Sequence, residues 1–140
     1  MRVYVAGSSK EIPRVRAIMT ALRLAGHVIT HDWTPLVERF GSDGAAQERA
    51  LTPADLAKCA AADIHAIDDA ERVVMLWPRT KSEGAYVELG IAIGIGRPVT
   101  VSGGDRFWCA LLRDEEHRAA GHRVFDTDEE AIASLCGEAA

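Results

Sequence analysis

Short apolar runs alternate along the chain with longer segments in which apolar residues recur every three or four positions. The first pattern is typical of buried strands, and the second is typical of amphipathic helices. The runs predict strands at residues 2–6, 27–33, 72–77, 98–101 and 122–125. The recurring segments predict helices at about residues 8–25, 52–69, 82–95, 107–118 and 127–135.

This order, a strand followed by a helix and repeated about five times, indicates an α/β fold. We predict a single domain over residues 1–140, built on a doubly wound parallel sheet with helices on both faces. In such sheets, ligands bind at the carboxyl ends of the strands, where the strand order reverses. The turns after Ala6 and Trp77 are therefore the places where we expect chemistry.

The spacing of apolar residues also predicts which side of each helix faces the sheet. The predicted inward residues are Ile12, Val15, Ile18, Met19 and Leu22 in the first helix and Leu56, Ala60, Ile64 and Ile67 in the second. Ser8 and Glu11 have the spacing of a capping box, and Ser82 is placed to cap the helix at 82–95. Residues 34–52 hold few apolar positions, so we predict an irregular segment; whether it closes over a ligand stays open.

The chain is acidic overall, with 16 Lys and Arg against 21 Asp and Glu and a formal net charge of −5. A nucleic-acid polymer is therefore not the expected partner, because such binding needs basic surface. The longest apolar stretch, residues 86–95, contains Glu88 and is too short to span a bilayer, and the first residues predict a strand rather than a signal peptide. The three cysteines form no CxxC pair, so we expect no disulfide framework, no zinc ribbon and a cytoplasmic location.

Basic residues gather at the start of the chain, where residues 1–26 hold five Lys or Arg and one acid. This excess has two interpretations, a solvated helix face or a first turn that meets an anion. Ser8 and Ser9 begin a helix whose free N–H groups and dipole favour an anion, and Lys10 adds a positive charge. The spacing of Ser8 and Ser82 equally fits plain helix caps.

Glu88 needs a particular explanation, because it shares its helical face with Gly84 and three other uncharged residues, Ile91, Ala92 and Ile95. A carboxylate among apolar neighbours is costly unless it is hydrogen-bonded or used. This placement near the end of a buried strand indicates a functional acid. The alternative is that Glu88 lies at the helix margin and reaches solvent or a partner chain.

Four glycines lie in or beside the same helix, at positions 84, 90, 94 and 96. Each interior glycine costs about 0.5–1 kcal/mol relative to alanine, so they indicate the close approach of a ligand or another backbone. The spacing of Gly90 and Gly94 fits helix–sheet packing equally well. The glycines form neither a dinucleotide fingerprint nor a Walker A motif, so we expect no cofactor. His31 and Asp32 are adjacent and point to opposite faces of a strand, so we expect no metal either.

Three motifs together resemble one superfamily. They are Tyr-x-x-Gly-Ser at residues 4–8, Asp63 seven residues before the Ala-Glu-x-Val-Val strand at 70–74, and Ser-x-Gly-x-x-x-Glu-Leu-Gly at 82–90. This pattern is similar to that of the nucleoside 2-deoxyribosyltransferases and the deoxynucleoside 5′-monophosphate N-glycosidases. The resemblance runs from Arg2 to about Val101 and is most specific at residues 82–99.

The resemblance implies a role for each matching residue. Glu88 matches the nucleophile, Asp63 the acid that assists at the glycosidic bond, and Tyr4 the tyrosine beside them. Ser8 and Ser82 match two serines that contact the 5′-phosphate in the monophosphate hydrolases. Together with the switch-point rule, the resemblance also implies the strand order 2-1-3-4-5.

The chain departs from the family pattern at three places. Cys109 stands where the hydrolases bring a serine from a neighbouring subunit, and the asparagine that the transferases place in this region is absent from the whole chain. Residues 9–11 (Ser-Lys-Glu) replace the arginine- and glycine-rich phosphate loop of some hydrolases. Because the family's sites are completed by a second subunit, we expect a homodimer at least.

The resulting function is hydrolysis of the N-glycosidic bond of a (deoxy)nucleoside 5′-monophosphate through a covalent ester on Glu88, with a small molecule as the only substrate. Base exchange between deoxynucleosides and a non-catalytic nucleotide-binding module stay as alternatives. Trp33 either stacks on the base or is a core or rim aromatic. The candidate substrate-binding residues are Gly7, Ser8, Ser9, Lys10, Trp33, Ser82, Gly84 and Cys109.

Overall fold

Five parallel strands form one sheet in the order β2-β1-β3-β4-β5 in the computed structural model, which describes residues 1–39, 51–104, 109 and 112–138. The strands are β1 (Arg2–Ala6), β2 (Val28–Ile29), β3 (Arg72–Leu76), β4 (Val99–Ser102) and β5 (Arg123–Phe125). The predicted α/β class, parallel sheet and strand order are confirmed.

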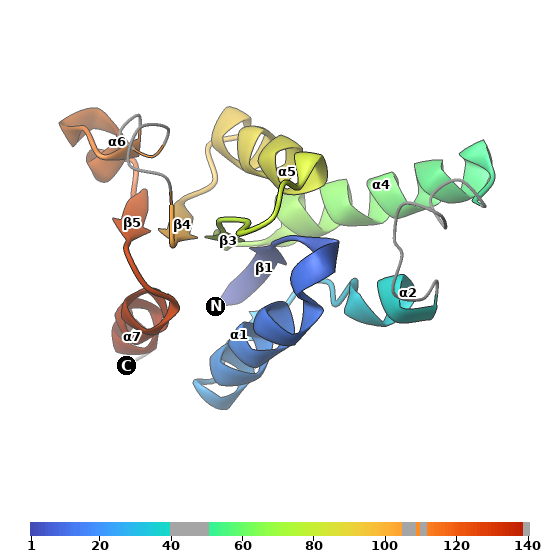
Figure 1. Ribbon diagram of the computed structural model, residues 1–140. Coiled ribbons are helices and arrows are strands. Elements are labelled where there is room, and N and C mark those ends of the chain that lie inside the picture. Colours follow the sequence, from blue (N-terminus) through green and yellow to red (C-terminus); the bar gives the residue numbers. More distant parts are fainter. Residues whose placement is uncertain (40–50, 105–108, 110–111, 139–140) are drawn as a thin grey trace.

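Helices cover both faces of this sheet (Figure 1). On one face lie α1 (Ile12–Leu24) and α7 (Asp128–Glu138), and on the other lie α4 (Pro53–Asp69) and α5 (Glu83–Gly94). Three short helices complete the described chain: the 3₁₀ turn η1 (Ser9–Glu11), α2 (Thr34–Arg39) and α6 (Glu115–Ala119). No helix among the described residues is long and apolar enough to cross a membrane.

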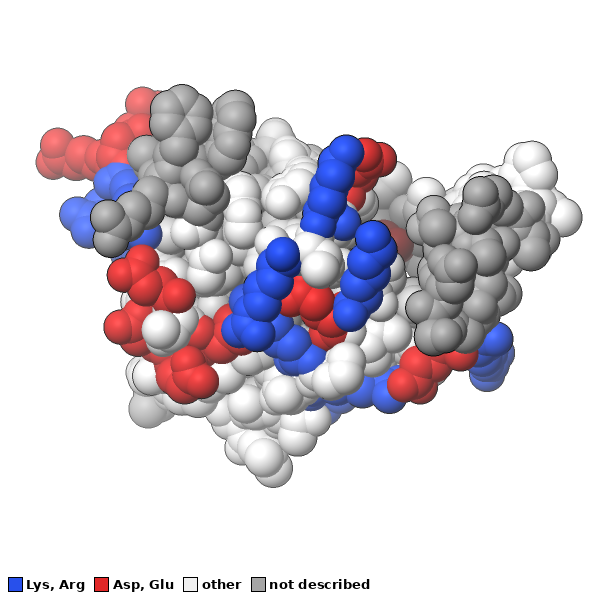
Figure 2. Space-filling model, viewed as in Figure 1, with Lys and Arg blue, Asp and Glu red and all other residues white. Residues whose placement is uncertain are grey.

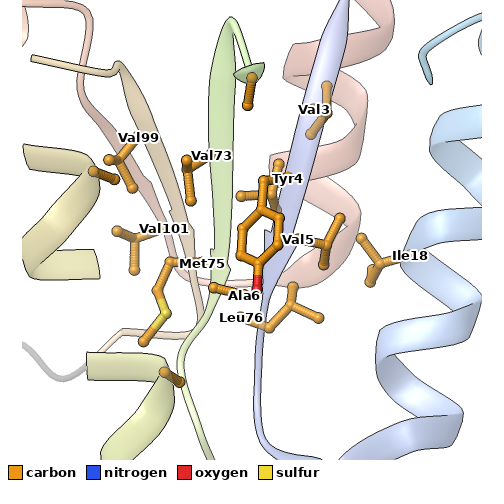
Figure 3. Close-up of a cluster of buried hydrophobic side chains, with 14 of the residues drawn as sticks. Val3, Tyr4, Val5, Ala6, Ile18, Val73, Met75, Leu76, Val99 and Val101 are labelled. Carbon is orange, nitrogen blue, oxygen red and sulfur yellow. The ribbon is translucent and has the colours of Figure 1, made fainter. Parts of the chain in front are cut away.

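The two central strands consist almost entirely of buried residues, because helices cover them on both sides. Residues 3–6 of β1 and 73–76 of β3 are essentially without exposed surface. In the register of this pair, Tyr4 lies opposite Val73 and Ala6 opposite Met75 (Figure 3). The carboxyl ends of β1 and β3 are therefore adjacent. Since β2 lies on one side of β1 and β3 on the other, the strand order reverses here, and the turns after these two strands border one crevice.

Two predicted boundaries are wrong. The strand predicted at 27–33 is only Val28–Ile29, and the stretch at 34–52 is not wholly irregular, because α2 begins at Thr34. At the start of α2, the carboxylate of Asp32 accepts hydrogen bonds from the Thr34 backbone N–H (3.2 Å) and hydroxyl (2.7 Å). Residues 40–50 lie outside the described residues, so the question of a lid is not tested.

A third boundary lies in the helix predicted at 107–118. Within its described part, α-helix covers only Glu115–Ala119. Asp114 sets this start, because its carboxylate accepts a 2.8 Å hydrogen bond from the backbone N–H of His117. Residues 105–108 and 110–111 lie outside the described residues.

The predicted caps are only partly correct. Ser8 caps η1 by accepting from the Lys10 backbone N–H (3.2 Å), but Glu11 does not complete a capping box. Its carboxylate accepts instead from Arg14 and from the Arg79 backbone N–H. Ser82 occupies the N-cap position of α5 but makes no side-chain capping bond. The start of α4 is as predicted, with Thr52 and Asp55 forming a full capping box.

The inward face predicted for α4 is only partly correct, because Ile67 is buried as predicted but Leu56, Ala60 and Ile64 are exposed. Leu56 is 41% exposed and Ile64 is 48% exposed, whereas Ala66 and Ile67 are buried. Figure 1 shows that the first half of α4 extends beyond the sheet, so it has no strand to cover. Apolar residues on that half are left for a ligand or for another chain.

Candidate active site

A cavity of about 880 Å³ opens at the carboxyl ends of β1 and β3. Its walls come from the turns after β1 and β3, from the segment after β2 and from α2, α4 and α5. Nine of the predicted site residues line it: Gly7, Ser8, Ser9, Lys10, Trp33, Asp63, Ser82, Gly84 and Glu88. The structure therefore brings together residues that lie up to 81 positions apart in the sequence.

The hydroxyl of Tyr4 lies between the two candidate acids. It is 2.8 Å from Glu88 Oε1 and 3.1 Å from Asp63 Oδ1, within hydrogen-bond distance of both. The ring itself is fully buried among the strand side chains, and its oxygen points toward the Ala6 and Leu76 ends of the strands (Figure 3). Core packing therefore fixes the position of this oxygen.

Three elements set this geometry. Alternation along β1 turns Tyr4 toward the face covered by α4 and α5, opposite to its neighbours Val3 and Val5, which lie toward α1 (Figure 3). Asp63 lies in the middle of α4, and Glu88 lies in the second turn of α5. Because α4 and α5 pack against each other and against β1, the two carboxylates reach one phenol from different helices.

Burial changes the protonation of both acids. Desolvation raises the pKa of Glu88 to about 7; the hydrogen bond from Tyr4 lowers it and the charge of Asp63 raises it further. The pKa of Asp63 is also raised by burial, against the opposing effects of the Tyr4 hydrogen bond and of His31. The pKa of Tyr4 is raised by burial and by both carboxylates, so the phenol stays neutral. Near pH 7 Glu88 is therefore protonated in part of the molecules, in addition to the neutral phenol.

The turn after β1 forms another wall. Gly7 is required there by space, because a Cβ at this position would lie 2.9 Å from Val15 Cγ2. The following Ser8 is 2% exposed, and its oxygen caps η1. Lys10 also lines the cavity, as do Lys58 and Lys81, so this acidic chain presents basic side chains around the opening. Such an arrangement suits an anionic group of a ligand.

Trp33 is anchored rather than free to adjust. Its indole Nε1–H donates a 2.9 Å hydrogen bond to the Val5 carbonyl, and the residue is 8% exposed. It still lines the cavity, so it contributes a rigid aromatic edge to the wall. Of the two interpretations of Trp33, a core or rim aromatic fits this position better than a side chain that is free to stack on a base.

Gly84 and Cys109 have opposite surroundings. A Cβ at Gly84 would meet no atom of the described residues within 4 Å, so this glycine leaves space in the described cavity wall. Cys109 is fully buried and is not among the residues that line the cavity. Its predicted contact across a subunit boundary is not part of the site seen in this chain.

The sequence analysis did not assign a role to His31, which lines the cavity with Nε2 3.8 Å from Asp63 Oδ1. Its position near the carboxyl end of the strand predicted at 27–33 was the available signal, but His31 was considered only as a metal ligand. An apolar wall was also missed, formed by Leu36, Val37, Leu51, Leu56, Cys59 and Ala62. Among the described residues, no group of three or more His, Cys, Asp or Glu side chains is arranged to hold a metal ion.

Behind the cavity, Arg14 connects the turns that follow β1 and β3. Its guanidinium donates to Glu11 (3.1 Å) and to the Trp77 carbonyl (2.9 Å), and the Glu11 carboxylate accepts from the Arg79 backbone N–H (2.9 Å). On the face seen in Figure 2, basic side chains surround acidic ones near the centre. The hydrogen bonds of Arg14 and Glu11 therefore fix the turn that carries Ser8 relative to the turn that carries Ser82.

Comparison with known proteins identifies the fold but not a family. No family model matches the chain, and no curated protein matches it. One similar solved structure is that of the Clostridium botulinum CMP N-glycosidase BcmB, with a TM-score of 0.60 and 16% sequence identity. The match covers 96% of this chain and 98% of that one. At this identity the likeness establishes the shared α/β architecture over the full length.

Proposed function

We propose that this chain hydrolyses the N-glycosidic bond of a nucleoside 5′-monophosphate and releases a free base and a sugar phosphate. One observation carries the proposal: two acids from different helices meet a buried tyrosine hydroxyl at the switch point of the sheet, inside a cavity. The N-glycosidase activity of the structural neighbour supports it. So do the three motifs shared with the deoxyribosyltransferase superfamily, to which we propose that the chain belongs.

The chemistry requires two acids with different tasks. Breaking the bond leaves positive charge on C1′ and negative charge on the base. Glu88, as a carboxylate, attacks C1′ and forms a covalent ester, which water then hydrolyses. Asp63 holds a sugar hydroxyl or passes a proton to the base. Tyr4 orients Glu88 through the 2.8 Å hydrogen bond.

The phosphate-binding end of the site is proposed at the turns after β1 and β3. Ser8, Ser9 and Lys10 from the first turn and Ser82 from the second line one cavity. Lys81 lies beside Ser82 in the same wall. A phosphate dianion held there leaves the apolar wall of α2 and α4 for the base, with the sugar over Glu88.

We also propose that the protein is a homodimer or a larger homo-oligomer. Apolar side chains stay exposed on α4 and α5, among them Ile64 (48%), Val87 (61%) and Ile95 (48%). Among the described residues, no atom lies within 4 Å of the place that a Cβ would take at Gly90 or Gly94, so these glycines do not pack closely on the described part of the sheet. Helices that are apolar on all sides are normally covered, and a second copy supplies that cover.

The location proposed for this enzyme is the cytoplasm, where nucleotides are found. The absence of a disulfide among Cys59, Cys109 and Cys136 fits a reducing compartment.

Chromatography of released base tests the proposed function. The panel pairs each deoxynucleoside with its 5′-monophosphate, adds the ribonucleotides, and is run with and without a second free base. Release from monophosphates alone, unaffected by added base, supports the hydrolase, and Glu88→Gln should abolish it. Exchange products from unphosphorylated nucleosides instead identify a transferase, and binding without release identifies a nucleotide-binding module.

A further inference from the structure

One phenolic hydrogen serves two carboxylates in this site. Tyr4 Oη is within hydrogen-bond distance of Asp63 Oδ1 and Glu88 Oε1, yet the hydroxyl has a single proton to donate. Both short contacts are satisfied when one of the carboxyl groups is itself protonated and donates to the phenol oxygen. The oxygens of Glu88, Tyr4 and Asp63 are then joined by two hydrogen bonds. The protonated carboxyl group donates one of them to the phenol, and the phenol donates the other to the remaining carboxylate.

We propose that Tyr4 relays a proton from Glu88 to Asp63 before the glycosidic bond breaks. The inference rests on the proposed function and gives Tyr4 a task beyond orienting Glu88. In this relay, Glu88 holds, in the resting protein, the proton that the leaving base later receives. The relay also explains how a buried Glu88 becomes a carboxylate only when it is needed.

The relay balances without any added reagent. Glu88 passes its carboxyl proton to the Tyr4 oxygen as the phenolic proton passes to Asp63 Oδ1. Before and after this step the site holds one carboxylate, one neutral phenol and one carboxylic acid. The Glu88 carboxylate then forms a bond to C1′ as the C1′–N bond breaks, and the electron pair leaves with the base. The base takes the proton from Asp63.

The second half of the cycle restores the starting state. Water attacks C1′ and gives a proton to the Asp63 carboxylate, and the electron pair of the ester bond returns to Glu88. A proton then shifts back from Asp63 through Tyr4 to Glu88, so Glu88 is protonated again. The raised pKa values of Glu88 and Asp63 support this sharing, because each carboxyl holds a proton more tightly than usual.

Other ionisable groups face these acids. His31, which follows β2, places Nε2 3.8 Å from Asp63 Oδ1, and when protonated it stabilises the Asp63 carboxylate between relay steps. The same cavity is lined by Lys10, Lys58, Lys81 and Glu83. These groups share the cavity with the two acids but do not lie between them, as Tyr4 does.

Leaving groups of different basicity test the relay. Tyr4→Phe is compared with wild type on a nucleotide that wild type cleaves, and on the 4-nitrophenyl glycoside of the same sugar phosphate, whose leaving group needs no proton. At pH 7, close to the pKa of Glu88, both the protonated and the ionised form of this acid are populated, and the variant should lose about 10²–10⁴-fold in kcat/KM on the nucleotide and less than about tenfold on the glycoside. Asp63→Asn should show the same contrast.

The control is Tyr86→Phe, which changes the other tyrosine of the chain and should leave both rates unchanged, since Tyr86 packs on Trp77 outside the cavity. Equal losses of Tyr4→Phe on both substrates show that Tyr4 only orients Glu88 and overturn the relay. Failure of wild type on every substrate overturns the proposed function instead.

A second measurement needs no variant. In the wild-type protein with ¹³C-labelled carboxyl groups, the Asp63 signal should move at the same midpoint pH as the Glu88 signal, because the phenol turns from one acid to the other. Separate midpoints without coupling contradict the relay even when Tyr4→Phe does not fold.

Discussion

Arg14 donates two parallel hydrogen bonds, each 2.8 Å long, to the two carboxylate oxygens of Asp128. The pair joins α1 to the start of α7, and the side chains are only 12% and 15% exposed. The hydrogen bonds from Arg14 hold the pKa of Asp128 below its usual range. Because Arg14 also contacts Glu11 and the Trp77 carbonyl, this one side chain fixes the C-terminal helix and both candidate phosphate turns.

Arg14→Met should therefore destabilise the protein and weaken nucleotide binding. The variant removes the bidentate partner of the largely buried Asp128 and one of the two partners of Glu11, so we expect a loss of about 3 kcal/mol in the free energy of unfolding. Urea unfolding measures this. The control Arg2→Met breaks an exposed ion pair with Asp69 and should cost less than about 1 kcal/mol. For the variant that remains folded, KM for a monophosphate should rise more than KM for the nucleoside; equal changes in both contradict a role in positioning the turns.

The raised pKa of Glu88 predicts a characteristic pH dependence of stability. The folded protein holds the Glu88 proton up to about pH 7, whereas the unfolded chain loses it near 4.5. The contribution of Glu88 to the free energy of unfolding is therefore fully present below pH 4.5 and is lost as the pH rises through 7. Compared with Glu88→Gln, wild type should lose about 3 kcal/mol in the free energy of unfolding over this window. Parallel stability curves for the two proteins contradict the shift.

Glu88→Gln should retain the fold and lose base release by more than about 10³-fold, because the amide cannot form the ester. In the wild-type protein, rapid acid quenching followed by mass spectrometry should reveal a sugar phosphate attached to the peptide that contains residue 88. Turnover by the variant at the wild-type rate rejects the covalent mechanism.

Three glycines with different surroundings give a graded test of the site. Gly7→Ala forces a contact with Val15 and should cost about 1–3 kcal/mol in stability. Gly84→Ala has free space around the new methyl group and should keep stability but raise KM, since the methyl occupies the cavity. Gly90→Ala is the control and should stabilise the isolated chain by about 0.5–1 kcal/mol. A wild-type KM for Gly84→Ala shows that substrate does not approach this wall.

The exposed apolar face of α4 and α5 predicts the result of Val87→Glu. A charge at this 61% exposed position is tolerated in a single chain but is buried in a dimer that uses this face. Sedimentation should show a dimer for wild type and a monomer for the variant. Glu83→Gln, at an exposed charged position on the same helix, should leave the dimer intact. A wild-type protein that sediments as a monomer rejects the proposed assembly.

The sequence predicted the fold well because its strongest signals are physically simple. Residues 3–6 and 73–76, within the predicted strands, are buried on both faces, and burial on two sides disfavours charged residues. Glu88 was singled out as a candidate functional acid for the opposite reason, because a charged residue is unexpected in an otherwise apolar helix. Neither signal depends on distant parts of the chain.

The wrong predictions concern residues whose position is determined by contacts with distant parts of the chain. Leu56 and Ile64 have the spacing of an inward face but are 41% and 48% exposed, and Leu56 lies on the half of α4 that extends beyond the sheet. Glu11 has the spacing of a capping box, but Arg14 and the Arg79 backbone compete for its carboxylate. His31 became visible only when α4 brought Asp63 to it, 32 positions along the chain. Periodicity reports local preference, and these positions are set by tertiary contacts.

The full burial of the Tyr4 ring has a consequence for how the protein fails on heating. A catalytic group on a loop is lost through local opening, well before the fold melts. Tyr4 lies in the middle of a central strand, so its own oxygen can move away from the site only when β1 separates from β3. The amide of Tyr4 should therefore exchange its hydrogen only through global unfolding. Thermal inactivation of the enzyme should accordingly coincide with the melting of the whole sheet rather than precede it.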